Sequence, residues 1–463
     1  MSSQYDVIVI GAGPAGYVCA IRAAQLGMKV ACVERRSTLG GTCLNVGCLP
    51  SKALLQSSEK YFSFRNEAAK HGIVAGEISF NLANMMARKD EIVSANIKGI
   101  QFLFKKHNIS WIKGAAVFKV PGTIVVAGTD YSAKHFVIAT GSESLSLPGL
   151  EIDETRIVTS TGALTLKAVP RRLVVIGGGY IGLELGTMWG RLGSEVTVVE
   201  FLDRLIPTMD AEIAESAKKI LEKAGLKFEL GRRVVGATRT NASISLTLTP
   251  ANGDGHETLE ADVVLVAIGR RAHTSGLGLA GIGVALDGQG RVKTDKRFAT
   301  NVPGIYAIGD VIAGPMLAHK AAEEGIALAE ILAGQAGNVN YSAIPGVIYT
   351  WPEVASVGKT EEELRGAGVS YKVGKFPFIA NGRARTMGDT DGFVKIIADK
   401  RTDTLLGAHI IGPDASAIIG ELVVAMEFGA SAEDIARTSH AHPSLNEAVK
   451  EAALAVDGRA LHI

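Results

Sequence analysis

The 463-residue sequence predicts an α/β fold in which one βαβ unit occurs twice and is followed by an α+β region. Two observations lead to this prediction. A short apolar run ending in G-x-G-x-x-G and continuing into a helical stretch begins at Tyr5 and again at Arg172, and this pattern is typical of Rossmann-like dinucleotide-binding units. From about Tyr341 strand-like runs alternate and helices follow, which is typical of an α+β module.

The length agrees with about three domains of roughly 150 residues each. We expect the first domain to comprise residues 1–146 and 273–341, because the second unit interrupts it. The second domain is expected at residues 147–272 and the third at residues 342–463.

Composition and charge exclude several classes of protein. Hydrophobic residues make up 47% and charged residues 21% of the chain, as in an ordinary globular protein. The net charge of +1 gives no excess of positive charge that would indicate nucleic-acid binding. No apolar run approaches the roughly 18 residues of a membrane-spanning helix. The N-terminus has no basic region and enters a strand at once, so we expect a cytoplasmic protein, or a mitochondrial matrix protein if this is a mature eukaryotic chain.

The first unit has the order strand, glycine motif, helix, strand, acid. In this motif Gly11 makes the turn, Gly13 lets the backbone approach a pyrophosphate, and Gly16 lets the helix pack on the strand. The phosphates are expected at the helix N-terminus, where the amides and the helix dipole are both positive. Glu34 ends the second strand and is placed to bind ribose hydroxyls.

The second unit repeats the first with the same internal spacing. A constant offset of 166 positions relates Gly177, Gly179, Gly182 and Glu200 to Gly11, Gly13, Gly16 and Glu34. One such glycine motif is weak support for a nucleotide site, but two complete units with identical spacing predict two dinucleotide sites.

Two dinucleotide sites in one chain suggest two cofactors that exchange electrons, a tightly held flavin and a nicotinamide. Glu200 favours NAD over NADP, because a carboxylate accepts the ribose 2′-hydroxyl and repels a 2′-phosphate. The next residues, Phe201 and Leu202, supply no cation for such a phosphate.

Further strands and helices are expected outside the two units. Three apolar runs, residues 135–141, 263–270 and 301–311, are expected to be strands that run into a glycine. The C-terminal region is expected to contain strands near residues 392–399 and 405–412, and helices near 418–429, 431–437 and 445–456.

The stretch GGTCLNVGCLPSKALL holds two of the four cysteines, Cys43 and Cys48, with four residues between them. Residues five positions apart on a helix point away from each other, so a bridge requires a distorted turn. Gly40, Gly41 and Gly47 permit one, and Pro50 is expected to keep Leu49 extended or irregular.

A strained and easily reduced bridge fits redox chemistry better than it fits stabilisation. Two buried thiols are the alternative. A metal site would need further ligands, but no histidine or second cysteine pair lies near these cysteines in the sequence. We therefore expect no metal. Cys19 and Cys32 lie on an apolar helix and strand and are expected in the core.

Taken together, the cysteine stretch, the two glycine motifs, the ATG at residues 139–141, VPGIYAIGD and the C-terminal HAHPSLNE resemble the pyridine nucleotide–disulfide oxidoreductases. The resemblance runs from Tyr5 to the last helix and is strongest to those members that oxidise dihydrolipoamide. It implies FAD in the first unit, NAD in the second and a homodimer formed by the C-terminal domain. The implied reaction is NAD-dependent oxidation of the dihydrolipoyl groups of 2-oxo acid dehydrogenase complexes or of the glycine cleavage system. The implied partners are the lipoyl domains or the core acyltransferase of such a complex.

The resemblance also assigns site residues. The implied FAD contacts are Gly11, Gly13, Gly16, Glu34, Gly41, Thr42, Lys52, Gly114, Gly141, Asp310 and Ala318. The implied NAD contacts are Gly177, Gly179, Gly182, Glu200, Val234 and Gly269. The implied catalytic residues are Cys43, Cys48, Lys52, Glu184, His442 and Glu447. Cys43 is implied to face substrate, Cys48 to face the flavin, and Lys52 to pair with Glu184 beside the flavin.

His442 and Glu447 lie five residues apart, with Pro443 interrupting the helix between them. A carboxylate bound to one imidazole nitrogen fixes the tautomer and leaves the other nitrogen as a base. From the residues alone such a pair is more typical of a cap or a surface contact than of a catalytic base; the resemblance instead implies a base that serves the disulfide of the other subunit. Ser444 stands where the family commonly has threonine, and we expect no loss of function. His440 and His319 are expected to be structural.

The sequence argues against three alternatives. A mercuric reductase usually carries a C-terminal cysteine pair, and no cysteine follows Cys48. A glutathione reductase favours NADP, whose 2′-phosphate would be repelled by the Glu200 carboxylate. A flavin-binding scaffold without turnover would not need the catalytic residues that are present.

Overall fold

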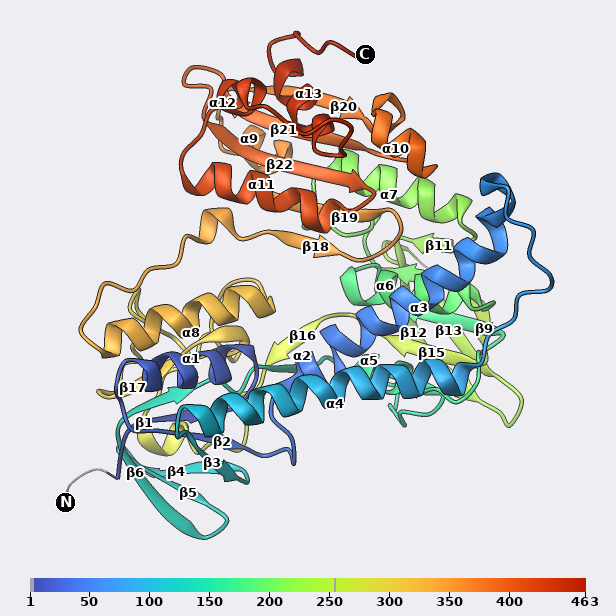
Figure 1. Cartoon of the computed structure of the whole chain (residues 1–463). Helices are drawn as coiled ribbons and strands as arrows, with labels where there is room; N and C mark the ends of the chain where they lie inside the picture. Colours follow the sequence, from blue (N-terminus) through green and yellow to red (C-terminus); the bar gives the residue numbers. More distant parts are fainter. Residues whose placement is uncertain (1–3, 254) are drawn as a thin grey trace. The chain divides into compact units, whose positions relative to one another are not determined.

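The computed structural model describes residues 4–253 and 255–463 (Figure 1). The chain divides into two compact units, which are described separately. The first unit contains Met1–Leu54, Ala83–Leu145 and Gly269–Val339, and the second contains Leu55–Leu82, Ser146–Ile268 and Asn340–Ile463. The second unit therefore holds both the second expected domain and the C-terminal one, together with residues 55–82, which were expected in the first.

The first unit is built on a sheet of order β3-β2-β1-β6-β5-β4, with β17 paired to β6. Its strands are β1 (Tyr5–Ile10), β2 (Val30–Glu34), β3 (Ser110–Lys113), β4 (Ala116–Val120), β5 (Thr123–Val126), β6 (Thr129–Ile138) and β17 (Ile305–Ala307), and a separate ribbon pairs β7 (Ser142–Ser144) with β16 (Arg270–Ala272). Strands β3, β2, β1, β6 and β17 run parallel, whereas β4, β5 and β6 form antiparallel hairpins. All five residues of β2 are buried, as expected for a parallel strand covered on both faces.

The helices of this unit are α1 (Pro14–Gln25), α2 (Gly41–Val46), the start of α3 (Cys48–Glu67), α4 (Leu82–Lys106) and α8 (Ala318–Leu332), with short 3₁₀ turns η2 (Ala280–Ile282) and η3 (Gly309–Val311). Helices α1 and α8 lie side by side (Figure 1). A Cβ atom on Gly325 of α8 would lie 2.6 Å from the Ala15 carbonyl oxygen of α1. The absence of a side chain at this position therefore permits the close packing. The core beneath them includes Cys19 and Cys32, both fully buried as predicted.

The described residues of the second unit form three sheets. The first is parallel, with order β11-β10-β9-β15-β8, and consists of β8 (Ile157–Val158), β9 (Arg172–Ile176), β10 (Glu195–Glu200), β11 (Lys227–Leu230) and β15 (Val263–Val266). The second is antiparallel and consists of β12 (Arg232–Arg239), β13 (Ile244–Pro250) and β14 (Glu257–Ala261). The third is also antiparallel, with order β18-β19-β22-β21-β20, and consists of β18 (Gly346–Ile348), β19 (Glu353–Gly358), β20 (Tyr371–Pro377), β21 (Phe393–Asp399) and β22 (Leu405–Gly412).

The helices of the second unit are the remainder of α3, α5 (Ser160–Ala163), α6 (Tyr180–Arg191), α7 (Ala211–Lys223), α9 (Glu361–Gly366), α10 (Gly382–Met387), α11 (Ala415–Glu427), α12 (Ala432–Arg437) and α13 (Glu447–Ala455), with 3₁₀ turns η1 (Ala68–His71), η4 (Tyr341–Ala343) and η5 (Phe378–Ala380). The strands and helices expected in the C-terminal region are all found. Helices α11 and α13 pack on the third sheet and enclose an apolar core that includes Ile410, Leu422 and Val449.

Candidate active site

Two glycine loops follow β1 and β9 and have the same geometry. Gly11 and Gly177 have φ angles of +106° and +109°, which L-residues with side chains rarely adopt. A Cβ on Gly11 would lie 2.3 Å from the Ala139 carbonyl oxygen, and one on Gly177 would lie 2.4 Å from the Ala267 carbonyl oxygen. Both turns therefore require glycine, as the sequence pattern predicts.

The acidic residues at the ends of β2 and β10 are held in the same way. Glu34 accepts hydrogen bonds from the amides of Ala12 (2.9 Å) and Arg36 (2.9 Å). Glu200 accepts them from the amides of Gly178 (2.6 Å) and Leu202 (2.8 Å). Each carboxylate is thus fixed against its own glycine loop, and its oxygens retain lone pairs for further donors such as ribose hydroxyls.

The first turns of α1 and α6 suit a pyrophosphate. Gly13 and Gly179 are the N-caps, and neither helix has a side-chain cap for its first amides. A Cβ on Gly13 would meet its nearest atom at 3.9 Å, and one on Gly179 would meet nothing within 4 Å. The space above both loops is therefore open to a ligand, and the helix amides can bind phosphate there. Gly16 and Gly182 pack against the carbonyls of Gly11 and Gly177.

The cysteines occupy two consecutive helices rather than one. Cys43 lies in α2, Gly47 ends that helix with φ −138° and ψ −111°, and Cys48 begins α3. The expected distortion is found at Gly47. The expectation for Leu49 was wrong: it is helical, because Pro50 lies in the first turn of α3, where a helix amide has no intrahelical acceptor.

The cysteine segment is docked on the first glycine loop. The Gly40 amide donates to the Ala12 carbonyl at 2.8 Å, and a Cβ on Gly41 would lie 2.5 Å from the Gly13 Cα. Thr42 follows as the second residue of α2. The backbone that carries Cys43 is therefore held against the loop where the sequence predicts the flavin phosphates.

Cys43 and Cys48 both carry thiol groups in the structure. A hydrogen bond between Cys43 and Cys48, together with burial, raises the pKa of the Cys43 thiol, whereas the nearby charge of Lys52 acts to lower it. The disulfide itself stays a prediction.

Asn45, between the two cysteines, fixes the segment by three hydrogen bonds. It accepts from the Thr38 hydroxyl at 2.7 Å and donates to the carbonyls of Leu39 (3.0 Å) and Gly41 (2.8 Å). Asn45 is not among the residues expected from the sequence, and its position inside the cysteine motif was the available signal.

Tyr17 and Arg270 were also missed. Burial, and then the neighbouring Cys43 and Cys48, raise the pKa of Tyr17. Burial lowers the pKa of Arg270, and the charges of Asp310 and Cys48 oppose this. Both side chains therefore lie within electrostatic reach of the thiols.

Arg270 belongs to a hydrogen-bonded chain that ends at Asp310. Its Nε donates to the Ser142 hydroxyl at 2.8 Å, its Nη2 donates to the Ser142 carbonyl at 2.7 Å, and the Ser142 hydroxyl donates to Asp310 at 2.6 Å. Asp310 lies in η3, which follows β17, and is one of the implied FAD contacts. The strand-to-glycine signal located Asp310, but the residues that hold it come from distant parts of the chain.

The other expected cofactor contacts lie at element ends. Gly114 donates its amide to the Glu34 carbonyl at 2.9 Å, and the Gly141 carbonyl accepts from the His273 amide at 2.9 Å. Ala318 is the first residue of α8. Val234 is buried in β12 at a register irregularity, and the Gly269 carbonyl accepts from the Leu145 amide at 3.0 Å.

Glu184 is buried in α6 and accepts a hydrogen bond from the Tyr349 amide at 3.0 Å. Lys52 lies in α3 within the first unit, whereas Glu184 lies in the second. Their expected pairing therefore stays a prediction.

His442 and Glu447 form the pair that the sequence analysis expects. His442 Nδ1 lies 2.9 Å from Glu447 Oε1, and the second carboxylate oxygen accepts from the Ser444 amide at 2.8 Å. Burial acts to raise the pKa of Glu447, but the Ser444 amide and His442 outweigh it and the pKa is lowered. The His442 side chain is 79% exposed, so the imidazole is fixed through Nδ1 and open to a partner at Nε2.

The neighbouring His440, which is expected to be structural, contacts a carboxylate of its own chain. Its Nε2 lies 2.6 Å from Glu421 Oε1, and Asn446 donates to the other Glu421 oxygen at 2.7 Å. A pocket of about 330 Å³ beside this segment is lined by Asp414, Pro443, Ser444 and their neighbours.

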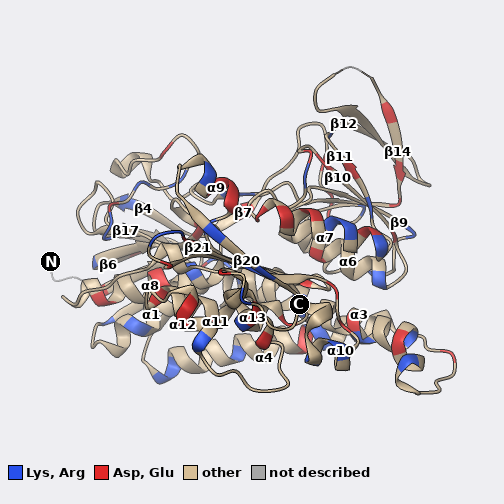
Figure 2. Cartoon of the chain, turned by 90° about the horizontal axis from the view of Figure 1, so that it is seen from above, with Lys and Arg blue, Asp and Glu red and all other residues tan. Residues whose placement is uncertain are grey.

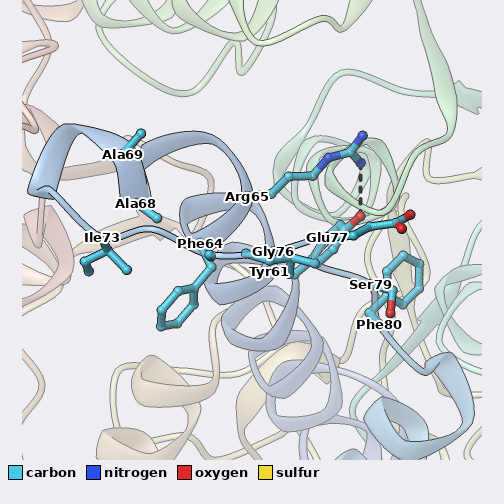
Figure 3. A pocket seen from close by; sticks show the side chains of 12 residues that line it. Tyr61, Phe64, Arg65, Ala68, Ala69, Ile73, Gly76, Glu77, Ser79 and Phe80 are labelled. Carbon is cyan, nitrogen blue, oxygen red and sulfur yellow. Dashed lines mark hydrogen bonds between the residues drawn. The ribbon is translucent and has the colours of Figure 1, made fainter.

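A larger pocket of about 530 Å³ lies between the end of α3 and the segment that follows η1 (Figure 3). Tyr61, Phe64, Ile73 and Phe80 line it, and Arg65 donates to the Tyr61 hydroxyl at 3.0 Å. None of its lining residues belongs to the expected site.

Asp210, Glu212 and Glu361 have spacing that could hold a metal ion. The ammonium group of Lys395 occupies their centre, however, at 2.9 Å from Asp210, 3.1 Å from Glu212 and in contact with Glu361. The group is therefore a buried ion-pair cluster rather than a cation site.

Charges of both signs are interspersed along the described helices (Figure 2). Helix α7, for example, carries the pairs Lys218–Glu222 and Lys219–Glu215, each at 2.6 Å. Among the described residues, no helix combines the length and apolarity needed to cross a membrane.

The chain is similar to known proteins along its whole length. Residues 5–325 match the family model of pyridine nucleotide-disulphide oxidoreductases, and residues 344–453 match the dimerisation domain of the same family. The mitochondrial dihydrolipoyl dehydrogenase of Pisum sativum is 54% identical, covering 100% of this chain and 93% of that protein. Dihydrolipoyl dehydrogenase 3 of Pseudomonas putida is also 54% identical, covering 99% and 100%. A leghemoglobin reductase of Vigna unguiculata is 54% identical, covering 98% and 88%.

Solved structures show the same fold. LpdA from Mycobacterium tuberculosis superposes with a TM-score of 0.89 at 28% identity, covering 97% of this chain and 99% of that one. The flavoprotein disulfide reductase RclA from Escherichia coli gives 0.87 at 28% identity, covering 98% and 99%. FAD and NAD, the expected cofactors, are those that this family uses. With its two glycine loops, hydrogen-bonded thiols and dimerisation domain, the chain belongs to the pyridine nucleotide–disulfide oxidoreductases.

Proposed function

We propose that the protein is an NAD-dependent dihydrolipoyl dehydrogenase that oxidises dihydrolipoyl groups carried by a 2-oxo acid dehydrogenase complex or by the glycine cleavage system. The observation that carries the proposal is the hydrogen-bonded Cys43–Cys48 thiol pair on a backbone docked against the first glycine loop. Relatives named dihydrolipoyl dehydrogenase that match the whole chain support it.

His442 is proposed to act as the base that deprotonates the substrate dithiol, because only a thiolate is a good nucleophile. Glu447 holds Nδ1 at 2.9 Å, so the imidazole can accept the proton at Nε2. The resulting imidazolium stabilises the thiolate that the reaction forms.

The cysteines are proposed to exchange two electrons with substrate by thiol–disulfide exchange. In the oxidised enzyme the substrate thiolate attacks Cys43 Sγ, the Cys43–Cys48 bond breaks, and Cys48 leaves as a thiolate. The second substrate thiolate attacks the substrate sulfur bound to Cys43 and closes the cyclic disulfide. Substrate has then lost two electrons and two protons, and the enzyme holds both cysteines reduced.

When bound, FAD supplies the two-electron step that returns the cysteines to the disulfide and passes a hydride to NAD⁺. Residues Gly11, Gly13, Gly16, Glu34, Gly41, Thr42, Lys52, Gly114, Gly141, Asp310 and Ala318 are proposed to hold it. Gly177, Gly179, Gly182, Glu200, Val234 and Gly269 are proposed to hold NAD. The proposed role of the chain's own residues is to place these groups and to exclude competing reactions.

The dimerisation domain implies a homodimer. We propose that His442 and Glu447 of one subunit serve Cys43 of the other, so the active site would be complete only in the dimer. Lipoyl domains or the core acyltransferase are the proposed partners. We propose a cytoplasmic location, or the mitochondrial matrix if this is a mature eukaryotic chain; the pea relative is named mitochondrial.

A steady-state assay of the FAD-loaded enzyme tests the proposal. Lipoamide and glutathione disulfide are each offered with NADH and with NADPH. Turnover is expected with lipoamide and NADH, and a rate near background with glutathione disulfide. Preference for glutathione disulfide and NADPH would instead identify a glutathione-type reductase and contradict the proposal.

A further inference from the structure

A cation lies beside the acidic end of β10 that the linear pattern around Glu200 does not reveal. The guanidinium carbon of Arg233 is 5.2 Å from the centroid of the Phe201 ring, and Phe201 directly follows Glu200. Such stacking of a guanidinium on an aromatic ring is favourable. The Phe201 ring is 49% exposed, so the stacked pair is accessible to a ligand.

The backbone fixes Arg233 in this place. Glu200 of β10 is in register with Leu230 of β11, and the Gly231 amide donates to the Leu202 carbonyl at 2.9 Å. The turn from β11 to β12 is therefore tied to the residues that follow Glu200. Arg233 comes second in β12, next to the buried Val234.

Glu200 marks the place of the ribose 2′ position. Its carboxylate is bound to the Gly178 amide in the glycine loop, and in such units this acid binds the 2′-hydroxyl. A 2′-phosphate there would be repelled by the carboxylate, but it would be attracted by a guanidinium, which binds phosphate through a planar pair of donors.

We propose that Arg233 is a specificity-determining residue of the second dinucleotide site and binds a 2′-phosphate once the charge of Glu200 is removed. In the natural protein the two side chains act in opposite directions at the 2′ position. Discrimination against a 2′-phosphate is therefore weaker than Glu200 alone would produce. This inference rests on the proposed assignment of residues 177–200 to NAD.

Arg232 supplies a matched control. It has the same charge and is adjacent in sequence, but its guanidinium lies 3.1 Å from Glu257 and 3.9 Å from Glu229. A neutral substitution at Arg232 changes the net charge of this face as much as one at Arg233 and leaves the Phe201 stack in place.

The experiment measures binding of adenosine 2′,5′-bisphosphate and of 5′-AMP to the FAD-loaded protein by isothermal titration calorimetry. Glu200→Ser is compared with the double variants Glu200→Ser/Arg233→Gln and Glu200→Ser/Arg232→Gln. We expect the Arg233 change to weaken bisphosphate binding by about 10- to 100-fold, the size of one charge-assisted contact, and the Arg232 change to leave it within about 3-fold. Arg233→Lys, which keeps the charge and loses the planar donors, should give an intermediate loss.

Unchanged bisphosphate affinity in the Arg233 double variant would overturn the inference. So would an equal loss for 5′-AMP and the bisphosphate, because that result would assign Arg233 to the adenine rather than to the phosphate. If neither NADH nor 5′-AMP binds the natural protein, the NAD site itself is wrongly assigned, which is a separate failure. Circular dichroism and FAD content confirm that each variant is folded.

Discussion

Gly47 brings Cys43 and Cys48 together by ending α2 one residue before α3 begins. A Cβ at this position would lie 3.0 Å from the Thr42 carbonyl oxygen and 3.3 Å from the Cys43 Cα. The position is therefore closely packed against the first cysteine. The two thiols meet across a helix break, a geometry that a continuous helix would not give.

The proposed order of the two cysteines can be tested by exchanging each for serine. We expect reduced Cys43→Ser, which keeps the Cys48 thiolate beside the flavin, to show a long-wavelength charge-transfer absorption band. Cys48→Ser should lack the band. Anaerobic absorption spectra of the FAD-loaded variants provide the measurement, and identical spectra for the two would reverse or remove the assignment.

His442→Gln removes the proposed base and keeps a hydrogen-bonding side chain of similar size. Dihydrolipoamide oxidation should slow by about 10²–10⁴-fold, the usual contribution of general base catalysis. Steady-state rates measure the loss. His440→Gln is the matched control, because His440 is bound to Glu421 at 2.6 Å and has no proposed role in catalysis. Equal losses in the two variants would contradict the proposed role.

At the scale of elements, the cysteine segment is held by Asn45 rather than by its own helix, since α2 is only six residues long. Three hydrogen bonds converge on this amide, from the Thr38 hydroxyl and to the carbonyls of Leu39 and Gly41. The segment that carries Cys43 is thereby closed into a compact loop.

Asn45→Ala should therefore loosen the loop. We expect the unfolding free energy to fall by about 1–3 kcal/mol, because the carbonyl acceptors lose their partners. The cysteines of the reduced protein should also react faster with a thiol reagent. Urea denaturation and reaction with dithionitrobenzoate measure the two effects. Asn96→Ala on α4, where the amide donates to the Ile92 carbonyl at 2.8 Å on an exposed face, is the control and should change neither by much.

The second compact unit contains an ion-pair cluster that joins α7 to α9 and β21. Lys395 is 1% exposed and contacts Asp210, Glu212 and Glu361. Burial acts to raise the pKa of Asp210, but hydrogen bonding to Lys395 helps lower it overall. The cluster thus links the second dinucleotide region to the dimerisation domain within one compact unit.

Lys395→Met should destabilise this unit by about 3–5 kcal/mol at pH 7, because it leaves carboxylates buried without their cation. The pKa of Asp210 and that of Glu212 are lowered in the folded natural protein, so their stabilisation is present above their ordinary pKa values of about 4 and is lost as pH falls below them. In Lys395→Met, the loss of unfolding free energy relative to the natural protein should become smaller as pH falls from 7 toward 4. Denaturation at several pH values tests this, and Lys375→Met, on a half-exposed lysine, should cost about 0–1 kcal/mol.

At the scale of the whole molecule, the proposed shared active site predicts complementation between two inactive chains. In a mixed dimer of Cys43→Ser and His442→Gln subunits, one of the two sites would combine an intact cysteine pair with an intact His442. Co-expression should therefore restore about a quarter of the natural activity when subunits mix at random. No recovery in isolated mixed dimers would show that both residues act within one chain.

The sequence predicted what depends on local spacing. Gly11, Gly177, Glu34 and Glu200 follow from motifs read within some 30 residues, and the structure places each at the expected strand end. The hydrogen bonds of Gly11 and Gly177 are the same in both βαβ units, because the two units have the same glycine motif and the same strand order.

Other parts could not be predicted, because they depend on contacts between distant segments. Arg270 reaches Ser142 across 128 positions, and Lys395 reaches Asp210 across 185. Arg233 was overlooked for the same reason, since only the turn after β11 brings it onto Phe201. Leu49 was misjudged because a proline in a first helical turn has the opposite effect from one in a helix interior.

The two βαβ units of the chain can also be compared with each other residue by residue. Helix α1 spans Pro14–Gln25 and α6 spans Tyr180–Arg191, so both ends are shifted by the same 166 positions as the glycines. Each residue of α1 therefore has a counterpart in α6, and pairs that differ, such as Pro14 and Tyr180, distinguish the two units. Exchanging such counterparts one at a time would show which of them determine the ligand of each βαβ unit.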